Sequence, residues 1–223
     1  MNKDKKTSIS QEDYLKAIWE LRQEGQIPIG ARIAEELKVS APAVTLALKR
    51  LSKDGYVTVD KNNRIYLTNK GEETASHLVR RHQLVEKLLT DFLKMEWYKV
   101  HDEAEKLEHT ISPEMEERLL EIFGKSQTCP HGYPLLENNK SSINVKPLHR
   151  AESGQILRIS RVYEKDRKFL EYLDKLGITP GTEVYVNDKG YDGTFALKIK
   201  GKIVHLGGIA TNRIWVKILS KKK

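Results

Sequence analysis

The segment of residues 30–67 constrains the fold of this chain more than any other stretch of the sequence. Apolar residues at helical spacing predict a short helix over 31–38, and a brief turn follows at Val39 and Ser40. A second helix is expected to start there, with Ser40 as its N-cap. Pro42 falls in the first turn of that helix, where the missing N–H of proline costs little.

The same segment continues into a predicted hairpin. Gly55 ends the second helix, and residues 56–67 alternate around the turn-rich run DKNN, as a β-hairpin does. Helix, turn, helix and hairpin in this order predict a winged helix-turn-helix, whose second helix enters the DNA major groove while the hairpin reaches along the backbone. The alternative is a small α+β packing unit. The short helix, the small-residue turn and the Ser-x-Pro start favour the DNA-binding interpretation.

The remaining sequence predicts helices first and strands afterwards. Helical periodicity and capping residues predict further helices over residues 10–24, 70–95, 100–110 and 112–124. Residues 125–146 are rich in Pro, Gly, Asn and Ser, and they are expected to form a linker. From residue 147 to 220, short β-type runs separated by turn residues predict a small β-barrel, interrupted by one helical stretch.

Composition restricts the location and the class of partner. No apolar run approaches the roughly 20 residues that span a bilayer, and the N-terminal residues are polar, so we expect a cytoplasmic protein with no membrane partner. The single cysteine, Cys129, excludes an intrachain disulfide. The net charge of +8 favours an acidic partner such as nucleic acid, although most of the excess lies in residues 147–223. Residues 76–124 are acidic and could hold a cation.

The stretch VHDEAEKLEH, residues 100–109, concentrates side chains of the metal-ligand type. On a helix, four of them fall within about a 100° arc, namely His101, Glu105, Glu108 and His109. Upstream, His82 and Glu86 share a helix face at i and i+4, so imidazoles and carboxylates of two helices predict a site for a divalent first-row metal. The alternative is a solvated acidic face with incidental histidines. The protease motif H-E-x-x-H is absent, which leaves a di-metal hydrolase unsupported.

A second possible metal-binding motif is CPHGYP, which contains Cys129 and His131. It lies in the predicted linker, and the chain has no second Cys-x-x-Cys pair. A structural turn is therefore the favoured interpretation of this motif.

The order of these motifs resembles the diphtheria toxin repressor family of iron- and manganese-dependent transcription regulators. The resemblance rests on EDYLKAIWEL, SAPAVTLALKRLSKDGYV, HQLVEKLLTDFL, VHDEAEKLEHTIS, CPHGYP and LDKLGITPGTEVYV. It implies a mainly α protein with α+β elements, which is not an enzyme and acts as a homodimer on double-stranded operators of metal-uptake genes. The implied domains are a winged helix-turn-helix over 1–73, a helical metal-binding and dimerisation domain with linker over 74–146, and an SH3-like (FeoA-like) domain over 147–223.

The resemblance also implies two metal sites. Carried onto this sequence, the primary site takes Asp13, Glu105, Glu108 and His109. The ancillary site takes His82, Glu86, His101 and a ligand of the C-terminal domain, for which Asp166 is the first choice and Glu164 the reserve.

Two departures from the family pattern bear on the metal. The iron-responsive branch carries Met and Cys where this chain has Asp13 and Glu105, and hard carboxylates favour Mn²⁺, with Fe²⁺ as the alternative. Zn²⁺, Co²⁺ and Cd²⁺ are expected substitutes in vitro. The short manganese regulators carry Glu at the position of Lys16, which argues against copying their paired-metal site.

The resemblance places the DNA contacts on the second helix of the motif. Ser40, Pro42 and Ala43 are expected near bases, and Thr45 and Lys53 near phosphates. A rival hypothesis is a metal-independent winged-helix regulator that senses a small molecule. A chelator would abolish DNA binding only if the metal-dependent hypothesis is correct.

Overall fold

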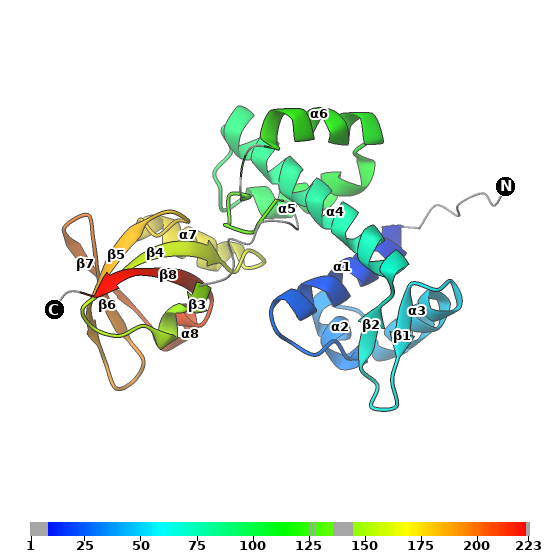
Figure 1. Cartoon of the computed structure of the whole chain (residues 1–223), viewed down its shortest axis with the longest axis horizontal. Coiled ribbons are helices and arrows are strands. Elements are labelled where there is room, and N and C mark those ends of the chain that lie inside the picture. Colours follow the sequence, from blue (N-terminus) through cyan, green and yellow to red (C-terminus); the bar gives the residue numbers. More distant parts are fainter. Residues whose placement is uncertain (1–8, 125, 127, 136–144, 222–223) are drawn as a thin grey trace. The chain divides into compact units, whose positions relative to one another are not determined.

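The computed structural model describes residues 9–124, 126, 128–135 and 145–221, and its contacts divide the chain into two units, Met1–Arg81 and His82–Lys223 (Figure 1). Both the predicted domain limit at residue 73 and the limit between the units fall within one helix, α4 (Asn69–Lys87). Each unit is described by itself.

The first unit is a winged helix-turn-helix. Its elements are α1 (Ile9–Gln23), α2 (Gly30–Leu37), α3 (Ala41–Lys53), β1 (Val57–Val59), β2 (Ile65–Leu67) and the start of α4. Lys38 adopts a left-handed conformation that ends α2, and the Ser40 hydroxyl accepts a hydrogen bond from the Ala43 N–H at 3.4 Å to begin α3. The apolar stripes of the three helices and the hairpin meet in one buried core. The predicted fold of residues 30–67 is therefore confirmed.

The second unit begins with a group of helices. After α4, the chain makes a π-helical turn at Leu88–Phe92, followed by α5 (Val100–Leu107), a 3-10 turn at Glu108–Thr110, and α6 (Pro113–Phe123). The sequence predicted one continuous helix to residue 95 and another to residue 110, so both predictions overran the α-helical part. Apolar periodicity alone does not mark the ends of the α-helices, because apolar residues continue through the π-helical turn and the 3-10 turn.

An antiparallel β-domain completes the second unit. Its elements are β3 (Val145–Pro147), β4 (Gln155–Val162), α7 (Arg167–Lys175), β5 (Glu183–Lys189), β6 (Phe195–Ile199), β7 (Lys202–Leu206), α8 (Gly208–Thr211) and β8 (Ile214–Lys221). The sheet order is β3-β8-β4-β5-β6-β7, and α7 packs on its buried face through Phe169, Leu170 and Leu173. This arrangement confirms the small β-barrel predicted from residue 147 onward.

Residues 128–135 of the predicted linker fold against β4, and residues 145–146, which the sequence also assigned to the linker, begin β3. The Cys129 N–H donates to the Tyr133 carbonyl at 2.8 Å, and the Val162 N–H donates to the His131 carbonyl at 3.0 Å. Gly132 is in the left-handed region (φ +92°), and a Cβ atom there would lie 2.0 Å from the Ser160 carbonyl oxygen. Only glycine fits at this position, and the tight approach fixes His131 beside the sheet. Residues 136–144 of the predicted linker lie outside the described residues.

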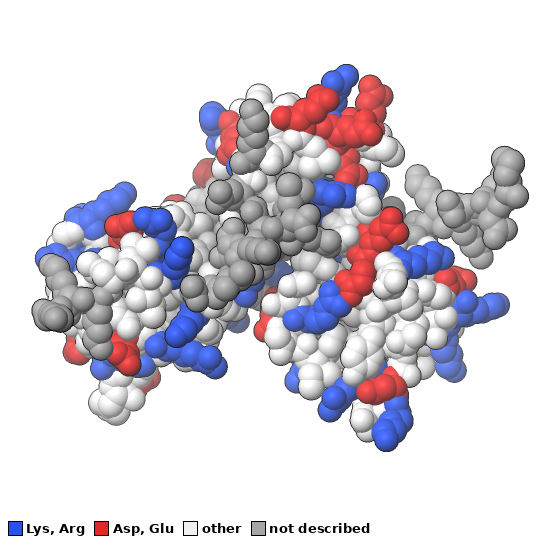
Figure 2. All heavy atoms as spheres, in the orientation of Figure 1, with Lys and Arg blue, Asp and Glu red and all other residues white. Residues whose placement is uncertain are grey.

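Surface charge differs between the two parts of the second unit. On the face drawn in Figure 2, acidic side chains gather over α6, whereas Lys and Arg are spread over the β-domain. Among the described residues, no helix is long and apolar enough to cross a membrane.

Candidate metal centre and nucleic-acid interface

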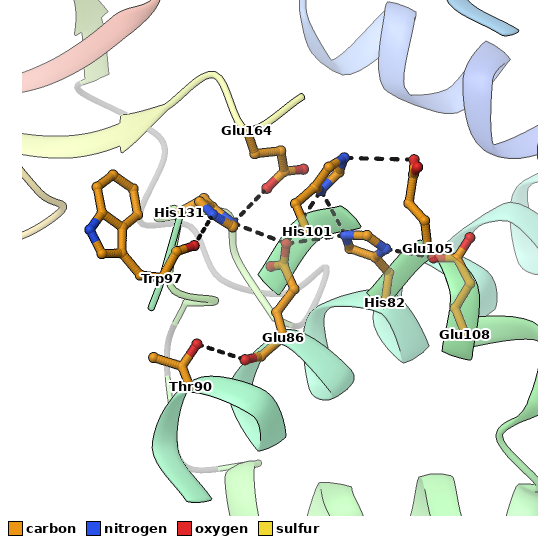
Figure 3. Close-up of polar contacts among 9 residues, drawn as sticks. All are labelled: His82, Glu86, Thr90, Trp97, His101, Glu105, Glu108, His131 and Glu164. Carbon is orange, nitrogen blue, oxygen red and sulfur yellow. Dashed lines mark hydrogen bonds and ion pairs between the residues drawn. The ribbon is translucent and has the colours of Figure 1, made fainter. Parts of the chain in front are cut away.

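A buried cluster in the second unit contains three histidines and two glutamates from four segments of the chain (Figure 3). Its members are His82 and Glu86 of α4, His101 of α5, His131 of the 128–135 segment, and Glu164 after β4. His82 and Glu86 point the same way because they are one helical turn apart. The tight turn at Gly132 and the end of β4 supply the other two side chains.

Glu86 lies at the centre of this cluster. Its Oε1 atom is 3.0 Å from His131 Nδ1, 3.1 Å from His82 Nε2 and 3.4 Å from His101 Nδ1. Among the described residues, Glu86 Oε2, His131 Nδ1 and Glu164 Oε2 are buried without a well-formed hydrogen bond, although His131 Nδ1 lies at ion-pair distance from Glu86 Oε1 and from Glu164 Oε2. Native proteins rarely bury polar atoms without a partner, and an ion is one of the few groups that can satisfy several of them at once.

The second ring nitrogen of each histidine faces an acceptor outside the cluster. His82 Nδ1 is 2.5 Å from Glu108 Oε2, and His131 Nε2 is 2.9 Å from the Trp97 carbonyl oxygen. His101 Nε2 lies 3.6 Å from Glu105 Oε1. An acceptor of this kind takes the N–H of a neutral imidazole and leaves the lone pair of the other nitrogen for a metal. His82 and His131 are therefore oriented as metal ligands are.

Electrostatics within the cluster follow from burial and from Glu86. Burial by itself raises the pKa of Glu86, but His131 and His82 outweigh it and hold that pKa well below its usual range. Burial lowers the pKa of His131, yet the charge of Glu86 and the contacts with Cys129 and Glu164 raise it well above its ordinary value. Burial, with the charge of Glu86, raises the pKa of the Cys129 thiol to about 12. A bound metal would replace the protons on His131 and Cys129, so metal binding would release protons.

The residues present fit a divalent metal. Imidazole nitrogens suit Zn, Cu, Fe and Ni, and carboxylates suit Mn²⁺. Glu86, Cys129, His131 and Glu164 each offer a ligand atom, and these atoms all lie within 4.8 Å of one another. His82, His101 and Glu164 form a second such set.

The sequence allows Cys129 and His131 as possible metal ligands but favours a structural turn for the CPHGYP motif. The backbone of CPHGYP does form a turn, but the His131 side chain is fully buried against Glu86 and Glu164. The signal available in the sequence was the Cys-x-His spacing itself. Nothing local showed that the turn would pack onto β4.

The two candidate ligands of the C-terminal domain lie in different surroundings. Glu164 Oε2 is 3.3 Å from His131 Nδ1, within the cluster. Asp166 instead caps α7, where its Oδ1 atom accepts the Phe169 N–H at 3.1 Å, and its Oδ2 atom accepts from Arg213 at 2.8 Å. The reserve choice of the sequence is thus the one that the structure brings to the histidines.

The predicted primary ligands are distributed over both units. Asp13 is half-buried on α1 of the first unit, and Glu105 is largely exposed on α5 of the second. The α-helical part of α5 ends at Leu107, and Glu108 and His109 continue the chain in a 3-10 turn. Glu108 is buried, with His82 beside one oxygen and His109 Nε2 3.7 Å from the other.

The predicted DNA contacts share the exposed surface at α3. Ser40, Pro42, Ala43, Thr45 and Lys53 are all exposed. The Thr45 hydroxyl donates to the Ala41 carbonyl at 3.0 Å, and Leu46 adds an apolar side chain beside it. An exposed helix face of small, polar and apolar groups suits the major groove, where base edges offer both polar atoms and methyl groups.

A winged helix and a buried histidine–carboxylate cluster in one chain define the class of metal-responsive DNA-binding proteins. Three family models match in the same order. They are the iron-dependent repressor N-terminal DNA-binding domain over residues 6–64, the iron-dependent repressor metal-binding and dimerisation domain over 68–137, and the FeoA domain over 146–218.

Individual relatives agree with these models. The chain is 35% identical over 192 residues to the diphtheria toxin repressor of Corynebacterium efficiens, a match that covers 80% of this chain and 84% of that protein. It is 40% identical over 189 residues to the iron-dependent repressor IdeR of Mycobacterium leprae, which covers 78% of this chain and 82% of the relative. The chain belongs to the diphtheria toxin repressor family of metal-dependent transcriptional repressors. Proteins of this family are repressors rather than enzymes, and they bind DNA operators as metal-activated dimers.

Solved structures show the same fold. A manganese-dependent transcriptional repressor in complex with manganese superposes with a TM-score of 0.84 at 30% identity, covering 94% of this chain and 100% of that chain. The repressor ScaR with bound Zn²⁺ superposes with a TM-score of 0.76 at 29% identity, covering 93% and 98%.

Proposed function

We propose that this repressor is activated by Mn²⁺ and binds pseudo-palindromic operators of metal-uptake genes as a homodimer. The observation that supports it best is the buried cluster around Glu86, whose orphaned oxygen and inward-facing imidazoles need a cation. Fe²⁺ is the alternative activating ion.

The ancillary site of this proposal consists of His82, Glu86, His101 and Glu164. A bound divalent ion supplies positive charge to two buried carboxylates. Glu108 holds the outward nitrogen of His82, which keeps the inward nitrogen available as a ligand, and Glu105 lies 3.6 Å from the outward nitrogen of His101. Glu164 connects the helices to the β-domain, so the β-domain takes a supporting part in metal binding.

The primary site consists of Asp13, Glu105, Glu108 and His109. Asp13 is on the winged-helix unit and the other three are on the second unit, so ligation by all four fixes the two units together. A metal shifts the population towards the DNA-binding arrangement only by its differential affinity for that arrangement. A hundredfold preference corresponds to about 2.7 kcal/mol.

The choice of Mn²⁺ rests on the ligands of the proposed primary site. The proposed primary site has three carboxylates and one imidazole, and hard oxygen donors suit Mn²⁺. A solved relative, the manganese-dependent repressor in complex with manganese, is consistent with that choice. Zn²⁺ binds more tightly to most sites of this kind, so affinity alone does not identify the ion loaded in cells.

DNA recognition in this proposal uses α3 of each protomer. Ser40, Pro42 and Ala43 face bases, whereas Thr45 and Lys53 reach phosphates. One recognition helix per chain requires a two-fold dimer to read two half-sites, which lie about one helical turn of roughly 34–36 Å apart, or a multiple of it. The helical part of the second unit exposes apolar side chains that a second copy can cover, namely Phe92, Leu93, Leu107, Met115 and Ile122.

The test is the fluorescence anisotropy of an operator fragment, measured against free Mn²⁺, Fe²⁺ and Zn²⁺ at one salt concentration. We expect tight binding with metal and its loss when a chelator is added. Unchanged DNA binding in chelator would instead support the metal-independent regulator. A footprint of a monomer on a single half-site would contradict the dimer.

A further inference from the structure

We propose that the hairpin of β6 and β7 is a second DNA-contact surface, which binds the phosphate backbone independently of base sequence. We call residues 195–206 the lysine hairpin, because they expose Lys198, Lys200 and Lys202. This inference goes beyond the proposed function, because it concerns the β-domain rather than α3 and it requires no metal ion.

The net charge of the chain lies entirely at its C-terminal end. The whole chain has 39 Lys and Arg against 31 Asp and Glu. Residues 1–192 contain 31 of each kind and are neutral as a whole, whereas residues 193–223 contain the other eight Lys and Arg and no Asp or Glu. The entire excess of +8 therefore belongs to the last 31 residues. Segregation of this kind favours an acidic partner such as nucleic acid.

The lysines of this segment have no acidic partner in the described part of the chain. Elsewhere in the β-domain, Arg158 pairs with Glu183 at 2.6 Å, and Arg213 pairs with an aspartate of α7's N-cap at 2.8 Å. The exposed lysines after residue 193 make no such ion pair among the described residues, namely Lys198, Lys200, Lys202 and Lys217. Their charges are available to a partner outside the chain.

The strand register places these lysines on the outer face of the sheet and around the hairpin turn. Lys198 is opposite Tyr185 on one side and Ile203 on the other, and Lys217 is opposite Arg158. Their neighbours along each strand are buried, so these two lysines face away from the core.

The other two lysines of the patch are at the end of the hairpin. Lys200 is in the turn with φ +47°, and Lys202 begins β7 at one edge of the sheet (Figure 1). The charges thus follow both strands and the turn. A row of flexible lysines suits a phosphate backbone, because each ammonium acts as a point charge without a fixed bonding geometry.

Protection of the sheet edge is the alternative explanation for these lysines, because charged side chains on an edge strand prevent pairing with other sheets. That explanation covers Lys202 on β7. It does not cover Lys198 on β6 or Lys217 on β8, since both strands have neighbours on each side. Glutamate also protects edges, so protection does not require a segment with charges of one sign. Duplex DNA is the polyanion that this family binds, and its backbone fits the pattern.

The test is the salt dependence of DNA binding by the full chain with Lys198→Gln and Lys202→Gln. Each lost phosphate contact lowers the slope of log affinity against log salt by about 0.9, so we expect a decrease of about 1.8. The deficit of the variant should then shrink about tenfold between about 50 and 200 mM salt. Anisotropy of an operator fragment and of a random-sequence duplex should show the same change, because phosphate contacts carry no sequence information. The random duplex is measured without metal.

Lys168→Gln with Lys175→Gln is the matched control. Both residues are exposed on α7, which packs on the opposite face of the sheet, and the change in net charge is the same. This pair should leave the slope unchanged. Thermal denaturation checks that each variant is folded, and Lys198→Gln alone should lower the slope by about 0.9 if the double variant is not.

Three results would overturn the inference. Equal slopes for the wild type and the hairpin variant would leave the lysines no DNA contact. Equal decreases for the hairpin pair and the α7 pair would show that net charge, rather than a surface, is responsible. Sedimentation with vesicles of phosphatidylserine and phosphatidylcholine, lost in the hairpin variant while DNA binding is unchanged, would assign the surface to a membrane. A wild type that ignores Mn²⁺ on the operator would contradict the proposed function alone, because the random duplex needs no metal.

Discussion

Residues 30–67 fold into α2, α3 and the hairpin through contacts between neighbours in the chain, whereas the cluster in Figure 3 gathers side chains from four separate segments. The first region is organised by periodicity, by the Ser40 cap and by the turn before it. The second depends on how the 128–135 segment and the end of β4 pack against α4 and α5. Changes in the first region should therefore act locally, and changes in the second should act through the packing of distant segments.

The largest effect should come from Gly132→Ala, which tests the packing of the 128–135 segment. A Cβ atom would meet the Ser160 carbonyl at 2.0 Å, and a positive φ is unfavourable for alanine, so we expect a loss of about 3 kcal/mol in the free energy of unfolding. Urea denaturation measures it. Gly177→Ala is the control, because it has a positive φ but no atom within 4 Å of the added Cβ. Equal losses in both variants would show that the close approach to β4 is unimportant.

The next largest effect is expected from replacing both Asp13 and Glu105, which tests whether their carboxylates determine the metal selectivity. Replacing Asp13→Met and Glu105→Cys introduces soft donors, so activation should shift from Mn²⁺ towards Fe²⁺ or Co²⁺ by at least about tenfold in DNA affinity at fixed free metal. Operator anisotropy at constant salt measures this order. If the double variant keeps the wild-type order of metals, the manganese assignment loses its main support.

A comparable loss of metal affinity is expected for Glu164→Gln, but not for the matched variant Asp166→Asn. Losing a charged ligand should weaken metal binding at the ancillary site by at least about tenfold, or roughly 1.4 kcal/mol. Asp166→Asn should leave metal affinity unchanged, because Asp166 bonds to Arg213 and caps α7. Calorimetric titration of both variants in the His109→Ala background decides between the two residues. A loss confined to Asp166→Asn would restore the first choice of the sequence.

The smallest effects should come from two serine caps. Ser40→Ala and Ser112→Ala each remove a side-chain hydrogen bond at a helix start, so each should cost about 1 kcal/mol in the free energy of unfolding. Only Ser40→Ala should also weaken operator binding, because Ser40 is at the proposed DNA surface. Thermal denaturation and anisotropy measure the two consequences separately. Equal operator affinity for both variants would show that Ser40 only caps α3 and does not contact DNA.

The sequence alone was sufficient for features that depend on neighbouring residues. Apolar spacing located the winged helix-turn-helix, and Ser40 and Ser112 located the starts of α3 and α6, because a cap acts within one turn of its own helix. The spacing of His82 and Glu86 also placed both residues on one helix face, because i and i+4 positions always share a face.

Only the tertiary structure decided which distant groups meet. Glu164 and Asp166 are two residues apart and chemically alike, but α7 uses one as its cap while the other lies beside His131. Glu108 meets His82 of another helix, and the fit of Gly132 against Ser160 places His131 beside Glu86. Local periodicity contains no information on such meetings, because they depend on the packing of segments that are remote in the chain.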